Sequence, residues 1–97
     1  MKNPPKIIVL DISPQDLGGA FRNTTDCPLF RCAKRNGIRV SGVGVDEILI
    51  SDAQWLDSII AKLNEPFIID DYNKVKAGKT VFRTITLTEE QCALMHL

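Results

Sequence analysis

A short helix with recognisable signals at both ends, in residues 25–37, constrains the fold of this chain more than any other segment. Asp26 can accept hydrogen bonds from the unpaired N–H groups of the first turn, and Pro28 fits that turn because it has no N–H group to satisfy. Gly37 favours the left-handed conformation that ends helices. Apolar residues recur every three or four positions on one side, so the sequence predicts a narrow buried face and a basic outer face.

Four β-branched or alternating runs predict strands. They lie at residues 6–12, 38–43, 48–50 and 80–87. The middle two are separated by a glycine-containing turn, and they are therefore expected to form a hairpin, in which the glycines favour a bend or a bulge.

Capping patterns predict helices between these strands. Ser13-Pro14-x-Asp16 predicts a single helical turn, and Ser51-x-x-Gln54 predicts a longer amphipathic helix that buries Trp55 and ends before Pro66. Residues 67–77 predict another helix, and Thr88-x-x-Gln91 predicts a short final one.

This order of elements predicts an α+β fold. Strand, helix, two strands, two helices and a strand come close to the β-α-β-β-α-β pattern of a small ferredoxin-like (split β-α-β) sandwich. We expect a four-stranded, mainly antiparallel sheet with helices on one face. Residues 1–97 are interpreted as a single domain in which residues 1–5 form a loosely ordered lead.

Composition narrows the classes of function. Apolar residues make up 44% of the chain and the formal net charge is zero, which is typical of soluble globular proteins. The longest apolar run near the N-terminus is too short for a membrane span or signal peptide, so we expect a cytoplasmic protein with no membrane contact. Among the charged residues, those in 22–39 are mostly basic and those in 41–71 are mostly acidic. These blocks either neutralise one another or steer a charged partner.

Two charged sets are candidate contact residues. The basic set on the predicted helix and after it, a candidate for binding a partner or a phosphate, consists of Arg31, Lys34, Arg35 and Arg39. The acidic set is interpreted as a solvated surface and consists of Asp46, Glu47, Asp70 and Asp71. Binding of nucleic acid or a nucleotide is an open alternative, although Trp55, Phe67 and Tyr72 are expected in the core and would leave few aromatic rings for stacking.

Metal and nucleophilic chemistry are less well supported. Three thiols and one imidazole could supply a tetrahedral zinc site, and these ligands are Cys27, Cys32, Cys92 and His96. The spacing of the first two cysteines fits poorly on one helix face, and the alternative is that they cap or pack. The single histidine lies next to the chain end, a poor position for a catalytic base. We therefore expect no enzyme activity, cofactor or metal.

Two segments resemble a family of small, functionally uncharacterised proteins of bacteriophages and prophages. The first joins Ser13-Pro14-Gln15-Asp16 to the run Cys27-Pro28-Leu29-Phe30-Arg31-Cys32-Ala33-Lys34-Arg35, and the second spans residues 71–87. Phe30 and Cys32 stand where that family has alanines, and the final strand lacks the family's proline. The resemblance implies a phage or prophage origin and favours small accessory or anti-host proteins.

We therefore expect a non-enzymatic protein that occludes a host or phage macromolecule, most simply a protein and plausibly a defence component. Binding or sequestering a nucleotide or phosphate ligand, or assisting as a nucleic-acid-binding accessory, is the alternative. A second copy of the chain is a further candidate partner, in a homodimer.

Overall fold

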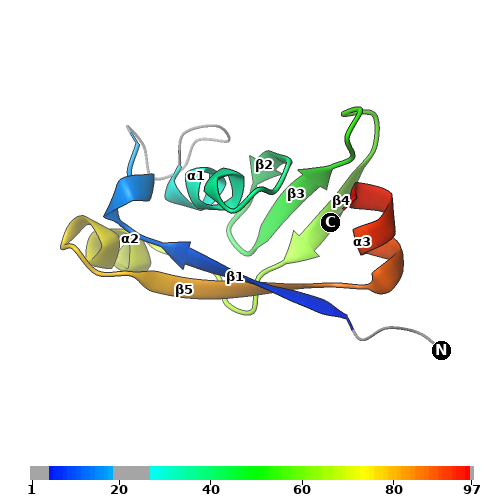
Figure 1. Ribbon diagram of the computed structural model, residues 1–97. Coiled ribbons are helices and arrows are strands. Elements are labelled where there is room, and N and C mark those ends of the chain that lie inside the picture. The colour runs from blue at the N-terminus through cyan, green and yellow to red at the C-terminus, as the bar shows by residue number, and fades with distance from the viewer. Residues whose placement is uncertain (1–4, 19–26, 97) are drawn as a thin grey trace.

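The computed structural model describes residues 5–18 and 27–96, in which five strands and three α-helices are arranged as Figure 1 shows. The predicted Asp26 cap and residues 1–4 of the predicted lead lie outside these residues.

A long two-stranded ribbon forms one side of the molecule. β1 (Lys6–Ile12) pairs antiparallel with β5 (Val81–Leu87), with Lys6 opposite Leu87, which confirms both predicted strands. Because side chains alternate between the two faces of a strand, every second residue enters the core and the others point away from it. The large apolar side chains on the outer face are those of Ile7, Val9 and Phe82.

A second, three-stranded antiparallel sheet has the order β2-β3-β4. It contains β2 (Val40–Val43), β3 (Glu47–Ser51) and β4 (Ser58–Lys62). The predicted hairpin is confirmed as β2–β3, and its register shifts between Val40 and Gly42, as expected for a glycine in a strand.

The helix predicted after Ser51 is wrong. Residues 52–57 form a loop and β4 follows it, paired with β3 along its whole length. Pairing with β3 and the β-branched Ile59 and Ile60 favour the extended form, and tertiary pairing outweighs the helical spacing of the apolar residues. As a consequence, Trp55 and Leu56 are exposed rather than buried.

The α+β class with antiparallel sheets is confirmed, whereas the four-stranded ferredoxin-like sheet is not. Within the described residues, β1 pairs only with β5, and the three other strands form their own sheet. A single bridge between Leu63 and Ile85 links the end of β4 to the ribbon. The unpredicted strand β4 therefore completes a second sheet instead of extending the first.

The predicted helix in residues 25–37 is present as α1 (Pro28–Arg35). Cys27 is its N-cap, and the Sγ atom of Cys27 accepts a hydrogen bond from the N–H of Phe30 at 3.4 Å. Gly37 follows the helix with a φ of 83°, the left-handed conformation that the sequence predicted.

The other three predicted helical segments are also present, although their bounds differ from the prediction. The 3₁₀ turn η1 (Pro14–Asp16) follows β1, and α2 (Ile69–Lys76) is shorter than the predicted 67–77. In α3 (Glu89–Met95) the capping box is formed, because the N–H of Gln91 donates to Thr88 Oγ1 at 3.1 Å and the N–H of Thr88 donates to Gln91 Oε1 at 2.9 Å.

The core lies between the ribbon, the second sheet and α1. Figure 1 shows α1 and the three-stranded sheet on the same side of the ribbon, with α2 and α3 towards its two ends. Side chains from both sheets and from the helices meet in one buried cluster. Its largest fully buried members include Leu10, Leu29, Ile50, Ile85 and Met95.

Candidate interaction surface

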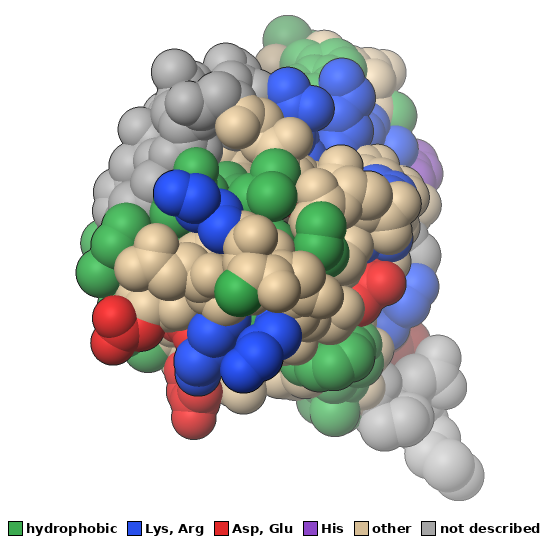
Figure 2. All heavy atoms as spheres, turned by 90° about the vertical axis from the view of Figure 1, so that its left-hand side faces the viewer, with side chains coloured by type: hydrophobic (Ala, Val, Ile, Leu, Met, Phe, Trp, Pro, Cys, Tyr) green, Lys and Arg blue, Asp and Glu red, His purple; other side chains and the backbone are tan. Residues whose placement is uncertain are grey.

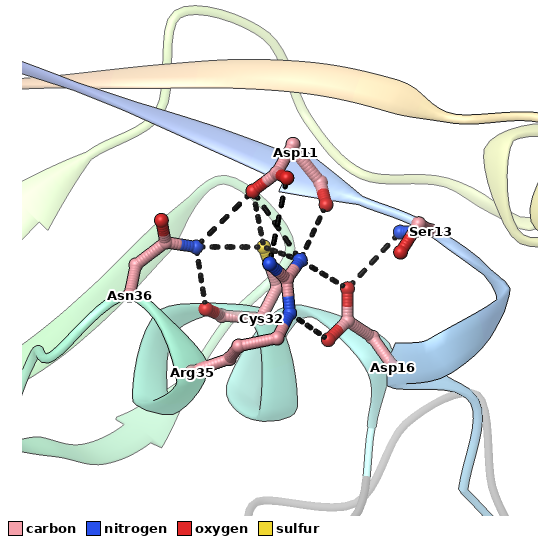
Figure 3. A network of polar contacts seen from close by, with 6 residues as sticks. All are labelled: Asp11, Ser13, Asp16, Cys32, Arg35 and Asn36. Carbon is pink, nitrogen blue, oxygen red and sulfur yellow. Dashed lines mark hydrogen bonds and ion pairs between the residues drawn. The ribbon is translucent and has the colours of Figure 1, made fainter.

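Arg35, one of the predicted contact residues, is instead tied into the fold (Figure 3). Its Nε and Nη2 atoms donate to the two carboxylate oxygens of Asp16, each at 2.9 Å. Asp16 is only 1% exposed, and the N–H of Ser13 donates to the same carboxylate at 3.0 Å. The bidentate pair therefore joins η1 to α1 and satisfies a buried charge.

The network continues to β1. Arg35 Nη2 donates to the backbone oxygen of Asp11 at 2.7 Å, and Asn36 Nδ2 donates to the Asp11 carboxylate at 3.2 Å (Figure 3). These hydrogen bonds from Asn36 and Arg35 hold the pKa of Asp11 below its ordinary value. Burial, reinforced by the nearby Asp16 carboxylate, raises the pKa of the Cys32 thiol to about 12. Cys32 is therefore a neutral packed thiol and a poor nucleophile at neutral pH.

Arg39 also serves the fold. Its Nε atom donates to the backbone oxygen of Ser51 at 3.3 Å, and its Nη2 atom donates to the backbone oxygen of Met95. The guanidinium thereby connects the start of β2 to the end of β3 and to the C-terminus of α3. Two of the four predicted basic contact residues are thus largely occupied by intramolecular hydrogen bonds.

Arg31 and Lys34 present their side chains to solvent on α1. The side chain of Lys34 forms no ion pair or hydrogen bond with the described residues. Figure 2 shows that Lys and Arg atoms on the visible face lie in separate groups, with apolar and uncharged atoms between them. The four predicted basic residues therefore divide into Arg35 and Arg39, which the fold engages in hydrogen bonds, and the exposed pair Arg31 and Lys34.

The acidic set also divides. Asp46 and Glu47 share Lys62, whose Nζ atom lies 3.7 Å and 3.3 Å from their carboxylates. Asp71 is buried and pairs with Arg83 at 2.8 Å, and it also accepts the N–H of Ile68 at 3.0 Å, which leaves Asp70 exposed on α2. The interpretation of Asp71 as part of a solvated surface is wrong, because it completes a buried ion pair.

The zinc alternative is not assembled. Cys27 caps α1, Cys32 belongs to the Arg35 network, Cys92 lies on α3 and His96 ends that helix with a φ of 59°. Across residues 5–18 and 27–96, no group of three His, Cys, Asp or Glu side chains could hold a metal ion. The alternative that Cys27 and Cys32 cap and pack is confirmed.

The loop at residues 52–57 exposes two large apolar side chains, Trp55 and Leu56, which the sequence had predicted to lie on a buried helix face. Trp55 is 59% exposed and Leu56 78% exposed, and Trp55 adopts a left-handed backbone with a φ of 60°. This conformation is a rare, strained one for a bulky side chain. The turn-favouring pairs Ser51-Asp52 and Asp57-Ser58, which lie between two β-branched runs, were the available signal for a turn.

Hydrogen bonds hold this loop closed. Asp52 Oδ1 accepts the N–H groups of Gln54 at 3.2 Å and Leu56 at 3.0 Å, and the N–H of Asp52 donates to the backbone oxygen of Asp57 at 3.0 Å. Desolvation raises the pKa of Asp52, but the hydrogen bonds from the loop's backbone N–H groups outweigh it, so that the pKa lies below its ordinary value. The loop is therefore preorganised to present Trp55.

Two hollows flank the exposed face of α1. One, of about 330 Å³, lies between α1, the start of β2 and the loop at residues 52–57, and it is lined by Phe30, Lys34, Gly37, Ile38, Arg39, Val40 and Trp55. The other, of about 420 Å³, is lined by Gln15, Asp16, Phe30, Arg31, Lys34 and Arg35. Phe30 and Lys34 belong to both, so they separate a mostly apolar hollow from a more polar one.

We use the name Trp55 surface for the exposed Trp55 and Leu56 of the loop together with three α1 side chains that line the two hollows. It consists of Phe30, Arg31, Lys34, Trp55 and Leu56. The described residues contain no helix that is long and apolar enough to cross a membrane. Comparisons with protein-family models, curated proteins and solved structures find no match to this chain.

Proposed function

We propose that this chain is a non-enzymatic binding protein that occludes a protein partner through the Trp55 surface. One observation carries the proposal: a hydrogen-bonded loop holds Trp55 in solvent with a left-handed backbone, next to Leu56. A soluble fold gains nothing from a strained backbone that exposes a large apolar side chain. Such strain commonly accompanies a binding role.

The chemistry of the surface supports a protein partner. Tryptophan and arginine are enriched among the residues that dominate binding energy in protein interfaces, and central apolar anchors are surrounded there by polar groups. A loop already fixed by hydrogen bonds loses little conformational entropy on binding. Because Lys34 lines the hollow beside Trp55, the favoured partner surface is acidic, which also speeds association.

The mechanism would be steric and electrostatic occlusion, since the surface needs only to cover the partner's own contact site. The resemblance of residues 13–16, 27–35 and 71–87 to phage and prophage proteins supports a bacterial partner, such as a defence component. On this proposal the chain acts as an inhibitor in the bacterial cytoplasm.

The experiment is a quantitative affinity capture from bacterial lysate with three baits. Wild type is compared with Trp55→Gly, which removes the indole while suiting the left-handed backbone, and with Phe82→Ala. Phe82 is a matched control, because it is an equally exposed aromatic residue (60%) on the ribbon. We expect specific proteins to be lost with Trp55→Gly and retained with Phe82→Ala. Retention with both, or loss only with Phe82→Ala, would contradict the proposal.

A second candidate function, binding of a nucleotide or single-stranded nucleic acid, is favoured by the combination of Trp55, Phe30 and Lys34 around one hollow. Aromatic rings next to a cation can stack on bases and contact phosphates. Gel-shift and thermal-shift measurements with mononucleotides and short oligonucleotides test it directly.

A further inference from the structure

The apolar hollow beside Trp55 allows the partner's contact to be specified further, and this inference rests on the proposed function. We propose that the hollow receives an aromatic or large aliphatic side chain of the partner, and that a carboxylate next to that side chain pairs with Lys34. The partner segment would therefore be an acidic stretch with one apolar anchor.

The lining of the hollow determines the anchor. Phe30, Ile38, Val40 and Trp55 supply apolar walls around about 330 Å³, which is at the lower end of the volumes of ligand pockets and enough for one side chain. Among the described residues, no Ser, Thr, Asn or Gln side chain lines it. The polar edge of a nucleobase would lose hydrogen bonds to water there without replacement, whereas an apolar side chain would lose none.

The charges around the hollow determine what flanks the anchor. Lys34 is exposed and has no side-chain partner among the described residues, while Arg39 already donates to two backbone oxygens. One available ammonium group matches a single carboxylate better than a chain of phosphates, which needs several cations. A free cation next to an apolar cavity therefore favours an acidic peptide over nucleic acid.

The position of Trp55 makes the proposal measurable, because it is the single tryptophan of the chain. Its fluorescence reports occupation of the hollow without a label. The probe is the blocked peptide Asp-Glu-Phe-Glu-Asp, compared with the same peptide carrying Ala in place of Phe, with Lys-Lys-Phe-Lys-Lys, and with adenosine monophosphate and an eight-residue oligothymidylate.

We expect the Phe peptide to shift the Trp55 emission saturably, and the Ala peptide to bind about tenfold more weakly or not at all. Lys34→Glu should weaken binding of the Phe peptide by about tenfold or more through charge repulsion. Lys74→Glu is the matched control, because Lys74 is also an exposed lysine in the last turn of an eight-residue helix, and it should change binding less than about twofold.

Three results would overturn the inference. These are the absence of a saturable response to the Phe peptide, equal binding of the Ala or Lys peptide, and tighter binding of either nucleotide probe. The lysate capture separates this failure from failure of the proposed function. Proteins lost with Trp55→Gly but retained with Lys34→Glu would leave the proposed function standing and contradict the acidic contact alone.

Discussion

Two short turns in this molecule are both closed by an aspartate carboxylate that accepts backbone N–H groups, but the turns have different roles. In η1 the carboxylate of Asp16 accepts the N–H of Ser13, and in the loop at residues 52–57 the carboxylate of Asp52 accepts those of Gln54 and Leu56. Asp16 is buried and is completed by Arg35, whereas Asp52 is only partly buried. The first turn joins α1 and β1, and the second projects a tryptophan.

The difference shows that an aspartate-capped turn can either stabilise a core or display a side chain, according to what surrounds it. Around Asp16 the chain supplies a guanidinium, which offsets the cost of burying the charge. Around Asp52 it supplies only backbone N–H groups, and the loop keeps its shape without contributing to the core. Substitutions at four positions test this contrast, from the largest expected effect to the smallest.

Asp16→Ala should lower the free energy of unfolding by about 3 kcal/mol, because it removes a buried bidentate ion pair and a backbone cap. Urea unfolding at pH 7 measures it. The neighbouring Gln15→Ala is the control, since Gln15 is exposed and should change stability by less than about 0.5 kcal/mol. Equal losses for the two variants would mean that the Arg35 network does not stabilise the fold.

Cys32 should make stability fall at alkaline pH. Its pKa is raised from 9.0 to about 12, so the unfolded chain releases the thiol proton first and gains stability as the pH rises above 9. The folded state should lose about 1.4 kcal/mol from this thiol at pH 10, and the loss should continue towards pH 12.

The measurement is urea unfolding from pH 7 to 10 under reducing conditions. Cys32→Ala should show a flatter dependence on pH than wild type, and Cys92→Ala, at a half-buried site on α3, should keep the wild-type dependence. The same slope in all three proteins would place the titrating group elsewhere.

Trp55→Gly should be more stable than Trp55→Ala by about 1 kcal/mol, because both remove the indole and only glycine relaxes the left-handed backbone. The same pair at Phe82, which is paired with Asp11 near one end of the ribbon, should have the opposite sign, since glycine weakens strands. Thermal or urea unfolding of the four variants gives both differences. If alanine were the more stable at position 55, the loop would not be strained.

Asp52→Ala should lower the thermal midpoint less than Asp16→Ala does, because its carboxylate is hydrated. The pKa of Asp52 is lower in the folded chain than its ordinary value of 3.8, so its stabilisation is present above that pH and is lost as the pH falls through the folded value. The midpoints of wild type and variant should therefore converge in strong acid. Asp57→Ala in the same loop should show no convergence, as the loop contacts of Asp57 use its backbone oxygen.

Local signals determined several elements correctly. Pro28 begins α1 and Gly37 follows its last turn. Ser13-Pro14-x-Asp16 forms a turn, and Thr88-x-x-Gln91 forms a capping box. Each of these depends on hydrogen bonds between residues only a few positions apart, which a sequence pattern specifies directly. The hairpin is predictable for the same reason.

Only the tertiary structure determined the secondary structure of residues 52–63 and the hydrogen-bond partners of the basic side chains. The apolar spacing from Trp55 to Leu63 fits a helix, but pairing with β3 and the bridge from Leu63 to Ile85 make it a loop and a strand. Arg35 is engaged by Asp11 and Asp16, which lie 24 and 19 residues away in the chain. Strand partners and charge partners depend on which distant residues the fold brings together, and no local pattern records that.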